Sequence, residues 1–330
     1  MKKFTLVLLI IFFSNFTASA IERRSEQFPS EFGYLALPLP YIIPGAGTGF
    51  GILGGFNNIP FGSYETTLDL FAIGIAGDIG GSIILATDFP VYPEAILLDI
   101  GQGNFDKGSF RSYRNRRMDS DPDDYVISEL SDTQFIFTRL AITLFDRMFD
   151  IFGFQTRNKS TLSAIRDKDG DLIYEANQSF EGDSSSYGFQ IDWTDDRTDP
   201  QKGIRFIYTT SDSPAADSDS PDYYVQSYNA TFYVPVFSYS TFAINWYRSG
   251  ATVRKQGNTD LDYLIAKETA TCLSNCDSDT IEVLAKNRQA NNLYGSGGNL
   301  GGTERLRSYV GGRYSGAQVE SRGAEFRWNL

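Results

Sequence analysis

The chain has 330 residues, of which 15% are aromatic, and a formal net charge of −12. The acidic balance argues against a nucleic-acid partner, because domains that bind nucleic acid carry basic patches. The sequence contains no histidine, which removes His-based triads and most transition-metal sites, so no metal and no cofactor is expected. A serine nucleophile would lack its base, and the chain is therefore not expected to be an enzyme.

The first 20 residues have the three parts of a secretory signal peptide. Lys2 and Lys3 give a positive start, 4–13 is an apolar run, and 18–20 is a small-residue cleavage site. An apolar run this short does not span a bilayer as a permanent helix, and the rest of the chain contains none long enough. The mature chain is expected to be one domain over 21–330.

Candidate strands follow one another from the start of the mature chain. The segment 34–44 is apolar but contains three prolines, which suits an edge strand. The glycine-rich segment 45–55 opens a strand with Phe50, Ile52 and Phe56 on one face. Five further candidates alternate less regularly: 63–75, 79–89, 92–104, 130–145 and 148–160.

From residue 187 onward, apolar and polar residues alternate, which places successive side chains on opposite faces of a strand. In the last strand Ala324, Phe326 and Trp328 share one face, and Glu325 and Arg327 share the other. A soluble sandwich would show the same alternation. The aromatic content of the apolar face, the signal peptide and the number of such segments favour strands between lipid and a polar lumen. The other alternating segments are 187–194, 204–209, 227–236 and 241–246.

Long and short connections alternate from residue 105 onward, as they do in an up-and-down barrel. The long ones are 105–129, 166–186, 210–222 and 250–300, and the short ones are 146–147, 195–202 and 237–239. The sequence therefore predicts an all-β fold, an antiparallel up-and-down transmembrane β-barrel of about 12 strands. It would lie in outer-membrane lipid of a Gram-negative type of cell, and no helix of useful length is expected.

Two small motifs in the connections have structural interpretations. Cys272 and Cys276 are four residues apart in a polar stretch, where an exported protein is expected to form a small disulfide loop; zinc would lack further ligands. The stretch 167–171 resembles a calcium loop, but its twelfth position is Gln178 instead of glutamate. A hairpin turn is expected there.

Near the C-terminal end, Gly301 and Gly302 lead into Arg307, Ser308 and Tyr309. This stretch resembles the barrel of the outer-membrane assembly and translocation superfamily, the BamA, TamA and FhaC-like proteins also called bacterial surface antigens. The resemblance implies that a long surface loop folds back into the barrel and carries an Arg-Gly-aromatic motif at its tip. Serine stands here in place of the central glycine of that motif.

A second stretch resembles the periplasmic turn of the same family, and a generic polar turn is the alternative interpretation. Its residues are Asp196, Arg197, Asp199, Pro200 and Gly203. The role is structural under either interpretation.

A guanidinium inside a barrel must be paired, because a lone buried charge costs several kcal/mol. If the loop folds inward, Arg307 therefore needs a carboxylate that faces the lumen. The alternation of the strands turns Asp192 and Glu325 inward and makes them the candidates. The alternative is that Arg307 is a solvated surface residue.

The resemblance implies an activity in inserting outer-membrane proteins or moving a substrate across the outer membrane, with unfolded outer-membrane or exported proteins as clients. Family members carry periplasmic POTRA domains before the barrel, and the short segment 21–33 leaves no room for one. The barrels of family members also have further strands after the one that follows the loop. Two interpretations are therefore left open: a shortened barrel, or a truncated, non-functional product. A passive channel or structural barrel is the alternative from another class.

Overall fold

The computed structural model describes residues 21–43, 45–60, 67–237, 239–302, 305–307 and 309–328. The expected signal peptide at 1–20 and the motif residue Ser308 lie outside the described residues. Both therefore remain predictions.

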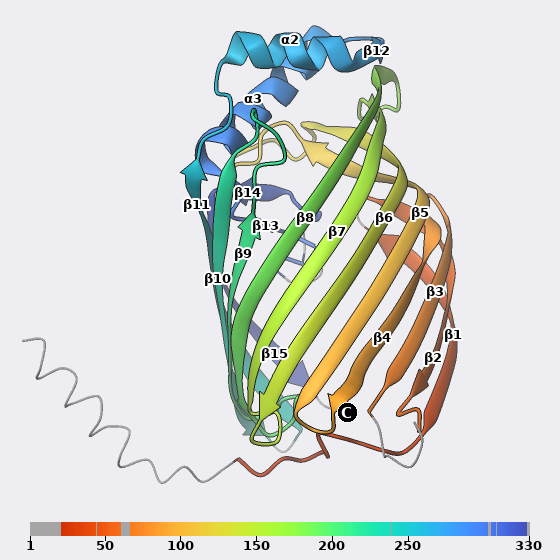
Figure 1. Ribbon diagram of the computed structural model, residues 1–330, viewed down its shortest axis with the longest axis vertical. Coiled ribbons are helices and arrows are strands. Elements are labelled where there is room, and N and C mark those ends of the chain that lie inside the picture. Colours follow the sequence, from red (N-terminus) through yellow and green to blue (C-terminus); the bar gives the residue numbers. More distant parts are fainter. Residues whose placement is uncertain are drawn as a thin grey trace, which may run out of the picture.

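Twelve long strands form one antiparallel sheet, in which neighbours in the sheet are also neighbours in chain order (Figure 1). This order confirms the predicted all-β, up-and-down architecture. The sheet curls around a lumen, and within the part of the chain that the structure describes no backbone pairing joins the first strand to the last. The strands are β1 (Gly33–Ile43), β2 (Gly47–Asn57), β3 (Asp69–Gly77), β4 (Gly80–Tyr92), β5 (Ile96–Tyr113), β6 (Tyr125–Leu144), β7 (Phe149–Arg166), β8 (Leu172–Thr194), β9 (Gly203–Ser213), β10 (Asp222–Phe237), β11 (Ser240–Lys255) and β15 (Gln318–Trp328).

The strand register separates an outer face from an inner face. Each of the twelve strands carries apolar side chains on the outer face, and Ile52 and Ile84 are 61% and 63% exposed. The same face carries the exposed Tyr34, Phe50, Leu70, Ile100, Leu140, Ile151, Tyr187, Ile204, Phe232, Ile244 and Phe326. Soluble monomers rarely expose contiguous apolar surface of this kind, so the outer face requires an apolar cover.

The strands β5 to β8 are longer than the sequence pattern predicted, and the expected connection at 166–186 is mostly strand. β8 already begins at Leu172, so that the turn after β7 is only 167–171. The extended parts of β7 and β8 carry outward charges, and Arg157 pairs with Asp183 at 2.9 Å. A strand with polar side chains on both faces lacks apolar alternation, which is why its pattern resembles a loop.

The turn at 167–171 is a hairpin turn, as expected. The Asp167 carboxylate accepts hydrogen bonds from the backbone N–H groups of Asp169 and Asp171, at 2.9 and 2.8 Å. Gly170 has a φ of +95°, a conformation that favours glycine. The aspartate and the glycine of this stretch therefore serve turn geometry.

Two helices, α2 (Leu261–Thr271) and α3 (Ser278–Tyr294), cover one end of the barrel (Figure 1). The expectation of no useful helix was wrong. Few apolar side chains of α2 and α3 pack against the barrel, so the sequences of these helices show little apolar periodicity. No helix in the described ranges is long and apolar enough to cross a membrane. The core beneath them contains Val126, Leu162, Ile165, Tyr174, Ala176 and Ile281.

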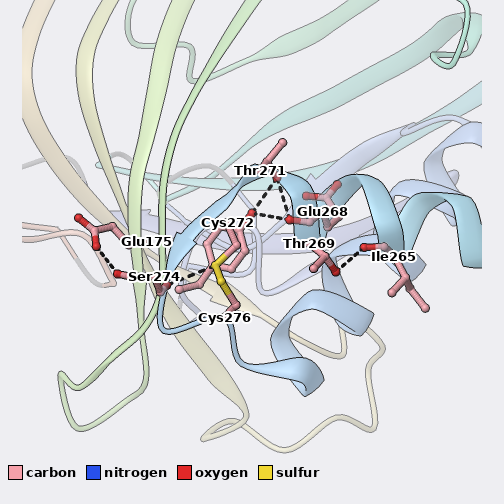
Figure 2. The surroundings of a disulfide bond; sticks show 9 residues. Glu175, Ile265, Glu268, Thr269, Thr271, Cys272, Ser274 and Cys276 are labelled. Carbon is pink, nitrogen blue, oxygen red and sulfur yellow. Dashed lines mark hydrogen bonds between the residues drawn. A yellow bond between two sulfur atoms is a disulfide. The ribbon is translucent and has the colours of Figure 1, made fainter.

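A disulfide between Cys272 and Cys276 closes the link between the two helices (Figure 2). The short strand β12 (Cys272–Ser274) at this link pairs with β8, where Cys272 lies opposite Ala176. The buried Tyr174 of β8 donates its hydroxyl proton to the backbone carbonyl of Glu268 at 3.2 Å. The disulfide and these bonds attach the helical cover to the extended end of β8.

Asp277 caps the N-terminus of α3, and its replacement by alanine should loosen that helix. Its carboxylate accepts from the Thr280 hydroxyl at 2.6 Å and from the Thr280 backbone N–H at 2.8 Å, and these bonds lower the pKa of Asp277. Loss of an N-cap costs about 1 kcal/mol, so amide exchange in α3 should rise roughly fivefold. Because the folded-state pKa is lowered, this stabilisation is present above the unfolded pKa and disappears as the pH falls through the folded value. Exchange measured by mass spectrometry at neutral pH checks it; unchanged exchange in α3 contradicts it.

Candidate functional site

A buried ionic cluster lies at the end of the barrel opposite the helices. Asp192, near the end of β8, is 0% exposed on the inner face. Its carboxylate lies 3.0 Å from Arg205, 3.8 Å from Arg197 and 3.9 Å from Arg23. The Thr194 hydroxyl donates to the same carboxylate at 2.6 Å. Asp192 does face inward, but its partners lie at the base of the barrel and do not include Arg307.

Alternating charges continue this cluster around the base. Arg197 donates to Asp150 at 2.7 Å, so it connects the β8–β9 turn to the start of β7. Arg147 binds both carboxylate oxygens of Asp88 at 2.9 Å, the bidentate geometry that makes such pairs strong. Arg197 also donates to the backbone carbonyl of Arg147 at 3.1 Å, so these pairs and those of Asp192 connect β4, β7, β8 and β9 in one network.

The segment 21–32, here called the N-terminal strap, crosses this base and completes the cluster. Arg23 donates to the backbone carbonyls of Thr194 and Asp192 at 2.9 and 3.1 Å. Arg24 donates to Asp195 at 2.9 Å. The strap had no recognisable pattern in the sequence, because each of these contacts spans more than 160 residues.

The β8–β9 turn has the geometry that its motif residues require. The Asp196 carboxylate accepts from Ser25 of the strap at 2.6 Å and from the backbone N–H groups of Thr198 and Asp199 at 2.7 and 2.9 Å. Burial opposes ionisation of Asp196, but these bonds prevail and lower its pKa. Gly203 has a φ of +113°, and a Cβ there would lie 2.0 Å from the Trp193 carbonyl oxygen.

The other motif residues of this turn have different surroundings. Pro200 is buried, whereas the Asp199 side chain is largely exposed. Arg197 points from the turn into the ionic cluster. The geometry is therefore that of a structural turn.

The long connection from β11 to β15 folds back along the inside of the barrel. Its short hairpin, β13 (Gly298–Leu300) with β14 (Tyr314–Gly316), precedes and follows the loop tip, residues 301–313. Gly301 and Gly302 have φ values of +107° and +92°, which only glycine adopts without strain. The Gly302 N–H donates to the Tyr309 carbonyl at 2.9 Å and closes the tip.

Arg307 lies 3.4 Å from Glu325 on the inner face of β15, but its side chain is 64% exposed. Glu325 was one of the two predicted partners of Arg307, whereas the expectation that Arg307 itself would be buried was wrong. Arg313 is the buried guanidinium of the loop tip, at 3% exposure. It lies 4.3 Å from the ring centre of Tyr113 and donates to the Ser120 carbonyl at 2.6 Å. The sequence signal that could have identified it is the Arg313-Tyr314 pair that follows two glycines.

The loop tip contacts both ends of the sheet. Val310 packs so closely on the β1–β2 turn that a Cβ at Gly45 would lie 2.3 Å from it. The Gly45 carbonyl accepts from the backbone N–H of Arg111 on β5 at 2.7 Å. On the other side Arg305 lies 3.6 Å from the ring centre of Tyr247 on β11. The tip therefore bridges strands that no backbone ladder joins within the described residues.

No protein-family model matches the sequence, and no curated protein matches it. Among solved structures the chain is similar to BamA from Haemophilus ducreyi lacking POTRA domains 1–3, with a TM-score of 0.45 and 10% sequence identity. The match covers 86% of this chain and spans about half (46%) of that structure.

Proposed function

We propose that the chain is an integral outer-membrane β-barrel whose lumen is filled by its own loop, and that it serves in outer-membrane protein insertion or translocation. The first part is supported by the apolar outer face on all twelve strands. Strands of 9 to 23 residues suffice for the roughly 9–11 residues that cross a bilayer. The second part rests on the resemblance of the loop and turn motifs.

The observation that carries the proposal is the loop tip held inside the barrel by Arg313 and Val310. A passive channel needs a continuous water-filled lumen. Here the helical cover lies over one end, the loop tip crosses the interior, and the N-terminal strap crosses the base. The arrangement favours a barrel that is closed at rest over one that conducts solutes continuously.

In a planar bilayer the protein should show no steady conductance. A variant in which residues 301–313 are replaced by a Gly-Ser linker should open a pore, because the side chains that cross the lumen are gone. The matched control replaces the exposed β7–β8 turn, 167–171, in the same way and should stay closed. Steady conductance of the unaltered protein would instead identify a passive channel.

The assembly activity has a separate test. Vesicles that contain the protein should accelerate the folding of an unfolded outer-membrane protein, followed as the band that shifts on boiling. Empty vesicles and vesicles with an unrelated barrel serve as controls. Equal folding rates in all three would contradict an assembly role and leave the barrel assignment standing. A chain that itself shows no heat-modifiable band would be an incomplete barrel.

A further inference from the structure

The inner face of the sheet differs between the two halves of the chain. In the second half it carries polar side chains such as Asn229, Asn245 and Glu325, as a water-filled lumen requires. On β1 to β4 the same face is mostly apolar. The register places on it Leu37, Leu39, Leu53, Phe71, Ile73 and Leu85.

The strands β1 to β4 are thus apolar on both faces. Strands of this kind are normally covered on both sides. Lipid would cover the outer face, but Leu37 and Leu39 on the inner face are 46% and 37% exposed. The apolar inner wall therefore faces open lumen and has room for an apolar occupant.

A cavity of about 590 Å³ adjoins the end of this wall at Ile43, between the β1–β2 turn, β5 and the loop tip. Ile43, Phe110 and Val310 line its apolar part, and Arg111 and Arg307 also line it. Its volume falls in the range of about 300–1,000 Å³ that is typical of small-molecule sites. The cavity therefore combines an apolar surface with two cationic groups.

Arg307 is able to accept an anionic ligand without leaving a carboxylate unpaired. Its contact with Glu325 is 3.4 Å long, whereas Arg327 already donates to Glu325 at 2.8 Å. The exposed guanidinium of Arg307 can therefore turn from Glu325 to a ligand, and Glu325 keeps Arg327. Carboxylate and phosphate oxygens both fit the planar guanidinium fork.

The geometry points to a binding site for a single-chain anionic amphiphile, such as a long-chain fatty acid or a lysophospholipid. The alkyl chain lies along the inner wall at Leu37 and Leu39, and the headgroup is held by Arg307. This inference depends on the barrel and its lumen, and not on the proposed assembly activity.

The test uses the full-length protein in phosphatidylcholine nanodiscs and a palmitic acid probe with a diazirine in its chain. After irradiation, the labelled residues are identified by mass spectrometry. The expected adducts lie on inner-face residues such as Leu37 and Leu39, and excess unlabelled palmitate removes them. Adducts confined to outer-face residues such as Ile52 and Ile84 would show bilayer partitioning alone and overturn the inference.

The Arg307→Gln variant should lower inner-face labelling about tenfold, the loss expected when a charge-assisted contact of about 1.4 kcal/mol disappears. A methyl palmitate probe with the same diazirine should lose the inner-face labelling as well. The control is Lys286→Gln on α3, an exposed cation that is paired with Glu282 and does not line the cavity. Undiminished labelling of the Arg307→Gln variant, or by the ester, would overturn recognition of the anionic headgroup.

Two further measurements separate the sources of failure. Each variant is first checked for a heat-modifiable band, so that loss of the barrel is not taken for loss of binding. A lysophosphatidic acid probe with the same diazirine is compared with the palmitate probe. Stronger inner-face labelling by one of them identifies a phosphate or a carboxylate as the preferred headgroup; absence of inner-face labelling by both overturns the proposal.

Discussion

Replacing Asp192 by alanine should destabilise the barrel by about 3–5 kcal/mol, the range observed when one partner of a buried ion pair is removed. The carboxylate is fully buried and lies within 4 Å of Arg23, Arg197 and Arg205. Without it three guanidinium groups share a buried site in which Asp150 remains as a counter-charge for Arg197. The repulsion should release the N-terminal strap first, because Arg23 is held at this site by one short segment.

The measurement is the urea midpoint of the heat-modifiable band, with the protein in vesicles. Asp183→Ala on the same strand is the matched control, because its pair with Arg157 is largely exposed and should contribute nothing measurable. The urea midpoint of the Asp192→Asn variant should fall between those of Asp192→Ala and Asp183→Ala, since the amide still accepts hydrogen bonds but has no charge. Equal midpoints for Asp192→Ala and Asp183→Ala would contradict a structural role for the cluster.

The sequence predicted strands well where their two faces meet different environments. Between residues 187 and 246, one face is apolar and the other polar, so alternation alone identified β8 to β11 and the direction of each side chain. The pattern failed at both extremes of polarity. In β1 to β4 both faces are apolar, and in the extended part of β8 both are polar, so neither shows a clean period of two.

The candidate site was only partly predictable. The alternation of residues along a strand shows which face of the sheet a side chain lies on, but not where it lies along the barrel axis. Asp192 and Glu325 were both placed inward, yet Asp192 lies at the base and only Glu325 lies beside Arg307. The height depends on the stagger accumulated over many strand pairs, which no local pattern encodes. The same limit concealed the contacts of Arg23 and Arg313, whose partners are distant in sequence.

Replacing Arg313 by alanine should release the loop tip from the barrel. The guanidinium is almost fully buried between the rings of Tyr113 and Tyr314 and donates to the Ser120 carbonyl at 2.6 Å. A desolvated cation–π contact and a charged hydrogen bond together contribute roughly 2–4 kcal/mol to holding the tip in place. Trypsin should then cleave after Arg305 or Arg307 at least about tenfold faster, as the open state becomes more populated.

Arg307→Ala is the informative comparison, because both arginines belong to the same loop tip and only one is buried. The exposed Arg307 pairs with Glu325 at 3.4 Å, and exposed pairs contribute little to stability. Its loss should leave cleavage after Arg305 as slow as in the unaltered protein. Arg313→Lys should behave almost like Arg313→Ala, because an ammonium lacks the flat guanidinium that stacks between two rings. If Arg307→Ala exposed the tip while Arg313→Ala did not, the Arg-Ser-Tyr motif would be the true anchor, and burial would be the wrong criterion for finding it.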